Sequence, residues 1–351
     1  MKKQTTNSRG GSSQNGSFFK NNVRELGLIV IIILISVLMN IYTGGGFITF
    51  GNINNLLSEA SILAILAIGM MMVIITGGID LSIGATMALS AMVSTSLMKT
   101  AILSGAGGLF TNPLVAILIA VAIGTICGVI IGELVSKMHI FPIIATLGMM
   151  YVYRGVTYLV SGGSWVLQQH MSKEFLAVAT GKFLGINNLI WITAILYIAA
   201  FFFMNYTKTG REIYAVGNDE ESARVSGINT SRVLTMSYAI MGAIAGLAGI
   251  LYVCKYAAAQ GETATGYEMN VIAACVLGGV SISGGSGKVQ GVLLGALLFG
   301  VLQNALPQIS NSAFYQDLIR GAIILVSVLL NIVLARRVDR KAIEEREAAL
   351  Q

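Results

Sequence analysis

A glycine-rich run in the C-terminal third of the chain contains residue types that could do phosphate chemistry. The run GGSGKV at residues 284–289 holds a Gly-Lys pair of the kind that binds phosphate in a P-loop. However, Ile282 stands where the first P-loop glycine is required, and Val289 stands where a Ser or Thr must hold magnesium. We therefore expect that this chain binds no ATP and no other cofactor itself.

The same run also fits a GxSG pattern, which intramembrane serine proteases use. A nucleophilic Ser286 would need a histidine base within hydrogen-bond reach, and the only histidines, His139 and His170, fall in loops. Two histidines so placed give no metal site, and the cysteines lie in apolar segments without CxxC spacing: Cys127, Cys254 and Cys275. We expect no catalytic residue and no metal, and intramembrane proteolysis is a disfavoured alternative.

Few ionisable side chains fall inside apolar segments, where they are costly and suggest function. Asp80 can either cap the N-terminus of a helix that follows it or serve in transport. Arg154 can either face a translocation path or extend to the lipid headgroups. An ion-coupled secondary transporter would use such residues together with Glu59 and Glu133, and this class is the main alternative function.

The segment 207–232 is the longest loop on the side of the membrane expected to face the cytoplasm, and it predicts a short capped helix. Asn218 can serve as its N-cap with Glu221 as capping-box partner, and Gly227 can end it. A helix of about two turns with both charge signs, held between two membrane spans, is suited to contact another protein in the cytosol.

These residues must be positioned by membrane helices, because the chain is 55% hydrophobic and only 11% charged. A bilayer core of about 30 Å needs roughly 20 apolar residues per helix. We predict an all-α integral membrane protein with about ten transmembrane helices, at residues 26–43, 56–77, 79–98, 112–136, 140–160, 187–206, 233–254, 268–284, 287–306 and 316–335. The connections at 77–79 and 284–287 can be tight turns or interrupted helices.

The positive charges indicate how this bundle is oriented. Most of the 22 Lys and Arg residues fall on one side of the predicted spans, which places both termini in the cytoplasm. Membrane orientation explains the net charge of +6, so no nucleic-acid partner is expected. Residues 1–25 are predicted to be a disordered cytoplasmic tail, 26–335 the transmembrane domain, and 336–351 a cytoplasmic C-terminal tail.

Two glycine clusters repeat with similar spacing. Gly77-Gly78 precedes Gly84, and Gly284-Gly285 precedes Gly291, in each case with five residues between. Internal duplication is common among transporters, although two clusters do not prove it.

Several stretches together resemble the ribose/galactose/xylose-type permeases of bacterial ABC importers. The loop sequence GREIYAVGNDEESARVSGI is similar to that family's coupling loop, and IGMMMVIITGGIDLSIGATMALSA at 68–91 is similar to its other hallmark. Further matches occur at 141–155, 273–291 and 315–325, so the resemblance covers nearly all of the chain after residue 25. The structural residues of the second motif are Gly77, Gly78, Asp80, Ser82 and Gly84.

The resemblance implies a multi-pass permease subunit in the bacterial cytoplasmic membrane. Its partners would be ATP-binding cassette ATPase subunits that bind ATP and Mg, an extracytoplasmic solute-binding protein, and a second permease, either a copy of itself or a paralogue. Coupling to the ATPase would involve Gly217, Asn218, Glu220, Glu221, Ala223, Arg224, Ser226 and Gly227. The solute would be a monosaccharide or a similar small polar molecule.

An uncharged sugar needs a path lined by neutral polar groups, and several polar residues lie in or beside the predicted spans. Each of them can line such a path or make an interhelical hydrogen bond instead. The candidates, with Arg154, are Asn55, Thr76, Thr146, Asn270, Gln303 and Asn304.

Overall fold

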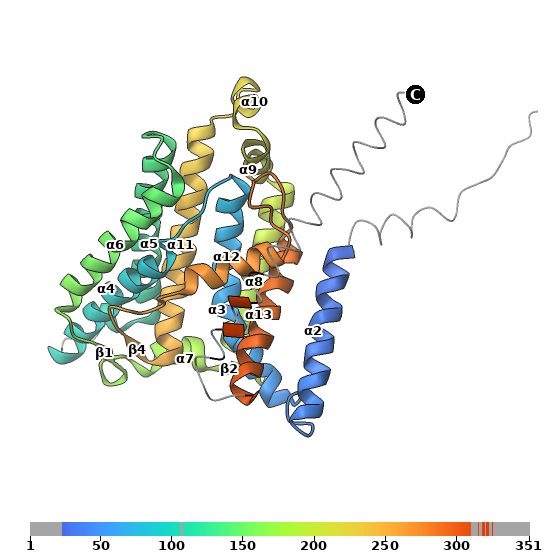
Figure 1. Cartoon of the computed structure of the whole chain (residues 1–351). Coiled ribbons are helices and arrows are strands. Elements are labelled where there is room, and N and C mark those ends of the chain that lie inside the picture. The colour runs from blue at the N-terminus through green and yellow to red at the C-terminus, as the bar shows by residue number, and fades with distance from the viewer. Residues whose placement is uncertain are drawn as a thin grey trace, which may run out of the picture.

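The computed structural model describes residues 23–105 and 108–309, together with Tyr315, Leu318, Ile319, Gly321, Ala322 and Leu325. Within these residues the chain is a bundle of helices (Figure 1), eight of them long and apolar enough to cross a membrane. They are α2 (Val23–Tyr42), α3 (Phe50–Ile75), α4 (Ile83–Leu103), α5 (Pro113–Ser136), α6 (Pro142–Ser161), α8 (Asn188–Tyr206), α11 (Thr230–Tyr256) and α13 (Val289–Ile309). The prediction of an all-α membrane protein is confirmed.

Shorter elements connect these helices. They are the helices α7 (Lys173–Thr180), α9 (Lys208–Asn218), α10 (Glu220–Val225) and α12 (Tyr267–Leu277), the 3-10 turns η1 (Leu109–Thr111) and η2 (Gln168–His170), and the strands β1 (Val166–Leu167), β2 (Lys182–Phe183), β3 (Ile186–Asn187) and β4 (Ala258–Ala259). The strands β2 and β3 form a hairpin. The strands β1 and β4 pair antiparallel, with Val166 opposite Ala259, and so join two loops that are far apart in the sequence.

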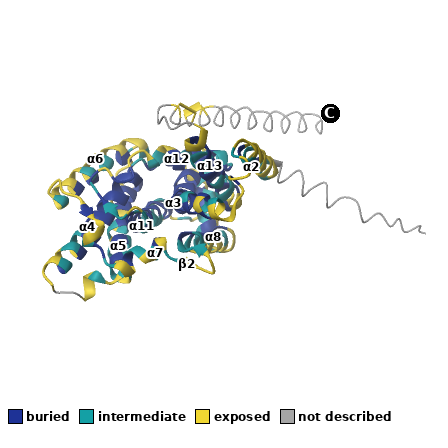
Figure 2. Cartoon of the chain, turned by 90° about the horizontal axis from the view of Figure 1, so that it is seen from below, coloured by how far each residue is buried: buried dark blue, intermediate teal, exposed yellow. Residues whose placement is uncertain are grey.

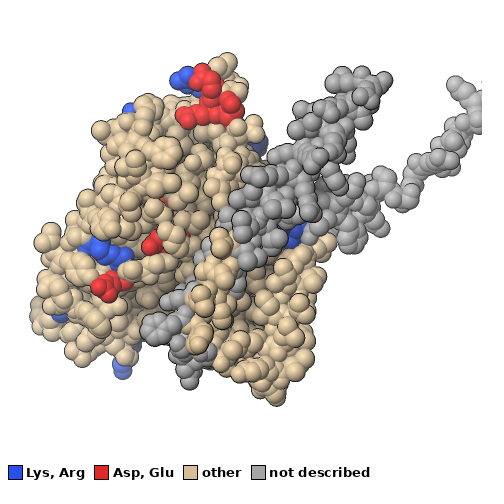
Figure 3. Space-filling model, in the orientation of Figure 1, with Lys and Arg blue, Asp and Glu red and all other residues tan. Residues whose placement is uncertain are grey.

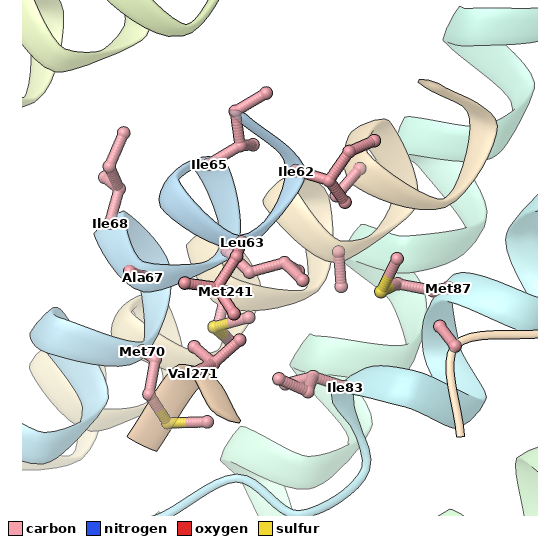
Figure 4. Packing of buried hydrophobic residues seen from close by; sticks show 14 of the residues in the cluster. Ile62, Leu63, Ile65, Ala67, Ile68, Met70, Ile83, Met87, Met241 and Val271 are labelled. Atoms are coloured by element: carbon pink, nitrogen blue, oxygen red, sulfur yellow. The ribbon is translucent and has the colours of Figure 1, made fainter. Parts of the chain in front are cut away.

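The core of the bundle is built on α3 and α11. Nearly the whole apolar part of α3 is buried, and the side chains of Ile65, Leu66 and Met70 are completely buried. A helix that is apolar on all sides belongs inside the protein, and Figure 2 shows α3 and α11 surrounded by the other helices. Figure 4 shows Met241 of α11 and Ile83 and Met87 of α4 packed near Ile62, Leu63 and Met70 of α3.

Glycines let α5 and α11 approach each other at backbone distance. A Cβ on Gly124 would overlap Gly242, and a Cβ on Gly128 would overlap the Tyr238 carbonyl. Gly132 packs in the same way on Thr235. The four-residue glycine spacing of α5 therefore serves helix packing.

Two regions of the chain differ from the predicted spans. The span predicted at 268–284 is the 11-residue helix α12, which ends at Leu277 because Gly278 and Gly279 follow, the latter with φ of +98°. A non-helical segment then runs to Lys288. Likewise α3 ends at Ile75 and α4 begins at Ile83, so residues 76–82 form a longer non-helical connection than predicted.

Two further boundaries are wrong by five or six residues, because α3 begins at Phe50 instead of residue 56 and α4 ends at Leu103 instead of residue 98. The other boundaries agree within three residues, with the first helix beginning at Val23 instead of residue 26. The tenth predicted span, 316–335, and the tail 336–351 lie outside the described residues, except for five single positions in that span. Residues 1–22 of the predicted N-terminal tail also lie outside them. The number of spans and the side of the two termini stay predictions.

Candidate functional site

The loop 207–232 folds into two consecutive short helices. Thr207 caps α9 by accepting a hydrogen bond from the Gly210 amide at 3.0 Å. The helix then runs to Asn218, and α10 follows after one extended residue, Asp219.

The N-cap of α10 is Asp219, so the assignment of that role to Asn218 is wrong. The Asp219 carboxylate accepts a hydrogen bond from the Ser222 amide at 2.6 Å. This bond, made by the charged form, lowers the pKa of Asp219 below its ordinary value. Asn218 cannot take the same role because its own backbone is still helical, as the last residue of α9.

The end of α10 is the glycine stop that the sequence predicts. Gly227 has a φ of +83°, its amide donates to the Arg224 carbonyl, and the Ile228 amide donates to the Ala223 carbonyl, both at 3.0 Å. This pattern is a Schellman motif, which favours glycine at the left-handed position.

The helix α10 projects from one end of the bundle (Figure 1) and displays charges of both signs there (Figure 3). Glu220, Glu221 and Arg224 are exposed, and the ion pair Glu221–Arg224 at 2.5 Å raises the pKa of the Arg224 guanidinium. Ala223 is the buried residue of the helix, and the neighbouring Val225 is 80% exposed. An exposed apolar residue among charges suits a helix that contacts another protein.

Backbone atoms join α9 to the end of α3 and to the segment 278–288. A Cβ on Gly217 would overlap the carbonyl oxygen of Ile75, the last residue of α3. The Gly285 amide donates to the same carbonyl at 2.9 Å. The Tyr214 hydroxyl of α9 donates to the Gly287 carbonyl at 2.8 Å. We call this three-way contact of α9, the end of α3 and the 278–288 segment the glycine junction.

The glycine junction explains the repeated glycine clusters in physical terms. Gly284 and Gly285 both have positive φ, and a Cβ on Gly284 would lie 3.1 Å from the Ile75 oxygen and 3.3 Å from the Gly77 nitrogen. The two clusters therefore meet in space. The contact residues Ile75, Tyr214 and Gly285 were not among the predicted site residues, and the repeated glycines were the one signal that pointed to them.

Asp80 is buried in the turn that precedes α4. Its carboxylate accepts two hydrogen bonds from Ser82, one from the amide at 2.8 Å and one from the hydroxyl at 2.7 Å. Ser82 occupies the N-cap position of α4, where no side-chain cap bond is made. Asp80 thus binds a free amide two residues further on, in the turn that leads into α4. Whether its role is capping or transport stays a prediction.

The glycines of the same motif allow close approach by other elements. A Cβ on Gly78 would overlap the Tyr238 hydroxyl, and one on Gly84 would lie 2.5 Å from the Ala264 carbonyl oxygen. Gly77 has open space around it and needs to be glycine for its φ of +83°. Thr76 caps the end of α3, with its hydroxyl donating to the Val73 carbonyl.

The predicted path residues lie in or directly after four helices, α3, α6, α12 and α13. Thr146 binds the carbonyls of Pro142 and Ile79, and Asn304 of α13 accepts from Asn52 of α3 at 3.0 Å. Asn270 is buried in α12, Gln303 is half-buried in α13, and Asn55 is exposed near the start of α3.

Arg154 is held by a loop of its own chain, and its role in a translocation path stays a prediction. Its guanidinium donates to the carbonyls of Gly261 and Thr263, at 2.7 and 2.9 Å. It thereby fixes the loop 257–266 to α6. Tyr158, one turn further along α6, packs directly on Gly261.

The chain is similar to known membrane transport proteins. The family described as "Branched-chain amino acid transport system / permease component" matches residues 52–328. The chain belongs to this permease family. It is 37% identical over 311 residues to the ribose import permease protein RbsC of Escherichia coli, which covers 88% of this chain and 94% of the relative.

Two other relatives are named for different sugars. The L-arabinose ABC transporter permease protein AraH of Azospirillum brasilense is 32% identical, over 92% of this chain and 91% of the relative. The galactose/methyl galactoside import permease protein MglC of Escherichia coli is 33% identical, over 91% of this chain and 97% of the relative. No solved structure matches the chain.

The family assignment confirms the main prediction of function. The chain is a multi-pass permease subunit of an ABC importer in the cytoplasmic membrane, and such a subunit is not the catalytic one. The secondary-transporter and protease alternatives are therefore set aside. Within the described residues, no group of His, Cys, Asp and Glu side chains could hold a metal ion, and all three cysteines are buried and unpaired.

Proposed function

We propose that this permease transports a monosaccharide. We further propose that α9 and α10 form the element through which separate ATPase subunits change the conformation of the permease. The curated relatives named for ribose, arabinose and galactose support the solute class. ATP and Mg would be bound by the ATPase subunits, and a solute-binding protein would deliver the sugar on the opposite side. A second permease would complete the path.

The glycine junction is the observation that supports the coupling role. Force applied to the exposed face of α10 reaches α9 through a single connecting residue, Asp219. From α9 it reaches the Ile75 carbonyl and the 278–288 segment through backbone contacts at Gly217 and a hydrogen bond from Tyr214. Backbone-to-backbone contact leaves no flexible side chain to absorb the movement, so a shift of α9 displaces the ends of α3 and α12 together.

The coupling role can be tested by replacing Glu220 to Arg224 with a Gly/Ser stretch in the complete complex of permease, ATPase subunits and solute-binding protein. Because these residues are exposed apart from Ala223, the bundle should stay folded, as judged by thermal unfolding in detergent. We expect loss of the ATPase stimulation that the loaded binding protein causes.

A matched control is Lys137→Ser, which breaks the exposed ion pair between Lys137 and Glu133 outside the loop 207–232. Such exposed pairs contribute little, so stimulation in this variant should equal that of the parent protein. Normal stimulation in the Gly/Ser variant would overturn the assignment of α10 to coupling.

A further inference from the structure

The helix α2 lies at the side of the bundle and is exposed along most of its length. Few of its residues are buried, and Figure 2 shows it beside α13 with exposed residues along it. Its C-terminal half packs on α13 through Met39, which lies in an apolar cluster with Val301 and Ala305. An apolar helix of this kind is stable in lipid without polar contacts. The charged contacts at its N-terminal end therefore need a separate explanation.

The guanidinium of Arg24, near the start of α2, binds the C-terminal end of α12. It donates a hydrogen bond to the Val276 carbonyl at 2.8 Å. A cation at this end of a helix is stabilised by the helix dipole. Gly279 leaves room for the guanidinium, because a Cβ at this position would lie 3.0 Å from it. Arg24 thus holds the point at which α12 ends and the 278–288 segment begins.

Glu25, the next residue of α2, binds the other end of the same segment. Its carboxylate pairs with Nζ of Lys288 at 2.8 Å, and only 18% of the Glu25 side chain is exposed. Lys288 directly precedes α13, and its carbonyl accepts a hydrogen bond from the Val292 amide in the first turn of that helix. A positive charge is unfavourable at the N-terminus of a helix, so the Glu25 carboxylate offsets it there.

Two helices therefore bind neighbouring residues of the 278–288 segment. The Tyr214 hydroxyl of α9 donates to the Gly287 carbonyl at 2.8 Å, and the next residue pairs with α2. Between the two ends of the segment, Gly284 and Gly285 both have positive φ, and glycines give the backbone more freedom than other residues do. Contacts at both ends are thus needed if the segment is to transmit a movement instead of bending.

We infer that Arg24 and Glu25 are positioning residues for coupling, which hold the 278–288 segment at both ends so that it moves as one unit with α9. A shift of α9 then displaces the segment, the end of α12 and the start of α2 together. The inference rests on the proposed function, because it concerns the same glycine junction, and it adds α2 to the parts that transmit the movement.

A double-mutant cycle on the ion pair tests this role in the complete complex of permease, ATPase subunits and solute-binding protein. The variants are Glu25→Gln, Lys288→Gln and the two combined, and rates are taken per assembled complex, well below its unfolding temperature. We expect each single variant to lose about fivefold or more of the ATPase stimulation by the loaded binding protein, the lower end of the usual coupling between two sites. The combined variant should lose no more than either single one, because all three remove the same contact.

Two controls separate coupling from a structural role. Lys137→Gln removes the exposed ion pair with Glu133, at a Lys exposure of 65% against 50% for Lys288, and should keep full stimulation. Lys288→Arg keeps the charge and should retain most of the stimulation. A lower unfolding temperature with unchanged stimulation in Glu25→Gln would mean that the pair is only structural, and would overturn the inference. Losses that multiply in the combined variant would overturn it too.

The Gly/Ser replacement of 220–224 separates this inference from the proposed function. Lost stimulation in that replacement, with full stimulation in Glu25→Gln and Lys288→Gln, would overturn the role of α2 and leave α10 as the coupling element. Full stimulation in all of these variants would overturn both.

Discussion

Gly217 is the residue on which the glycine junction depends most directly. Any side chain at this position must displace the Ile75 carbonyl, which also accepts the hydrogen bond from Gly285. Both neighbours are backbone, so relief requires α9 to move away from the end of α3. The role of Gly217 is thus set by space, since its φ is not in the left-handed region.

Gly217→Ala is therefore expected to destabilise the protein by about 1–3 kcal/mol, the usual cost of forcing extra atoms into a packed site. The stimulation of ATP hydrolysis by sugar should also decrease in this variant. Thermal unfolding and stimulated ATPase activity measure the two effects. Gly51→Ala in α3 is the matched control, because its added methyl group meets nothing within 4 Å, and a comparable loss in that variant would contradict the explanation.

The sequence identified these residues only in part. Gly217 and Gly227 were predicted from the loop motif, and both have clear structural roles. Asp80 and Arg154 were singled out because charge inside a membrane is costly, but their partners, Ser82 and the carbonyls of the loop 257–266, could not be predicted. Which backbone groups a buried charge reaches depends on packing between distant segments.

At the scale of the element, α10 has only six residues and relies on its caps. A helix of this length is not stable by propensity, so the bond from the Ser222 amide to Asp219 and the Schellman end at Gly227 are its main local supports. Because the pKa of Asp219 is lowered, this cap is fully charged at neutral pH. It is lost only when the pH falls through that lowered pKa.

Asp219→Ala should increase the rate of hydrogen exchange across 220–226, because the capping acceptor is lost. Asp219→Asn should retain most of the protection at pH 7, since an amide oxygen can accept the same bond. Mass-spectrometric hydrogen exchange on the complex measures both variants. The same exchange rate in the parent and the Ala variant would mean that an ATPase subunit, and not the cap, holds α10 in shape.

Hydropathy predicted the long helices well and the broken ones poorly. Apolar length is what defines a span, so α5, α8 and α11 were located within a few residues. The apolar residues of α12 are followed by further apolar residues, Val280 and Ile282, so hydropathy did not distinguish a full span from a half-length helix followed by a glycine loop. The choice between Asn218 and Asp219 as cap failed for a related reason, because both residue types are good caps and the decision depends on where α9 ends.

At the scale of the whole molecule, the orientation of the bundle follows from the distribution of Lys and Arg and stays a prediction. The helix α10 lies at one end of the bundle, and the exposed loop before β1 belongs to the connection after α6 that is predicted to face outward (Figure 1). Ser226 and Ser164 are exposed serines in these two regions.

Ser226→Cys and Ser164→Cys form a matched pair, since each changes one oxygen to sulfur. In intact cells, a membrane-impermeant maleimide should label Ser164→Cys and leave Ser226→Cys unlabelled until the membrane is broken. The buried native cysteines give a low background. The reverse labelling pattern would show that the orientation in the membrane is opposite to the predicted one. In that orientation no cytoplasmic ATPase could contact α10.

The short ladder between β1 and β4 ties the loop after α6 to the loop after α11. Arg154 anchors the second of these loops to α6, and Gly84 lets it rest on the first turn of α4. A displacement of one loop is therefore expected to displace the other loop, together with α4 and α6. If the proposed solute-binding protein docks on this side, it would contact both loops as one unit and would act on α4 and α6 together.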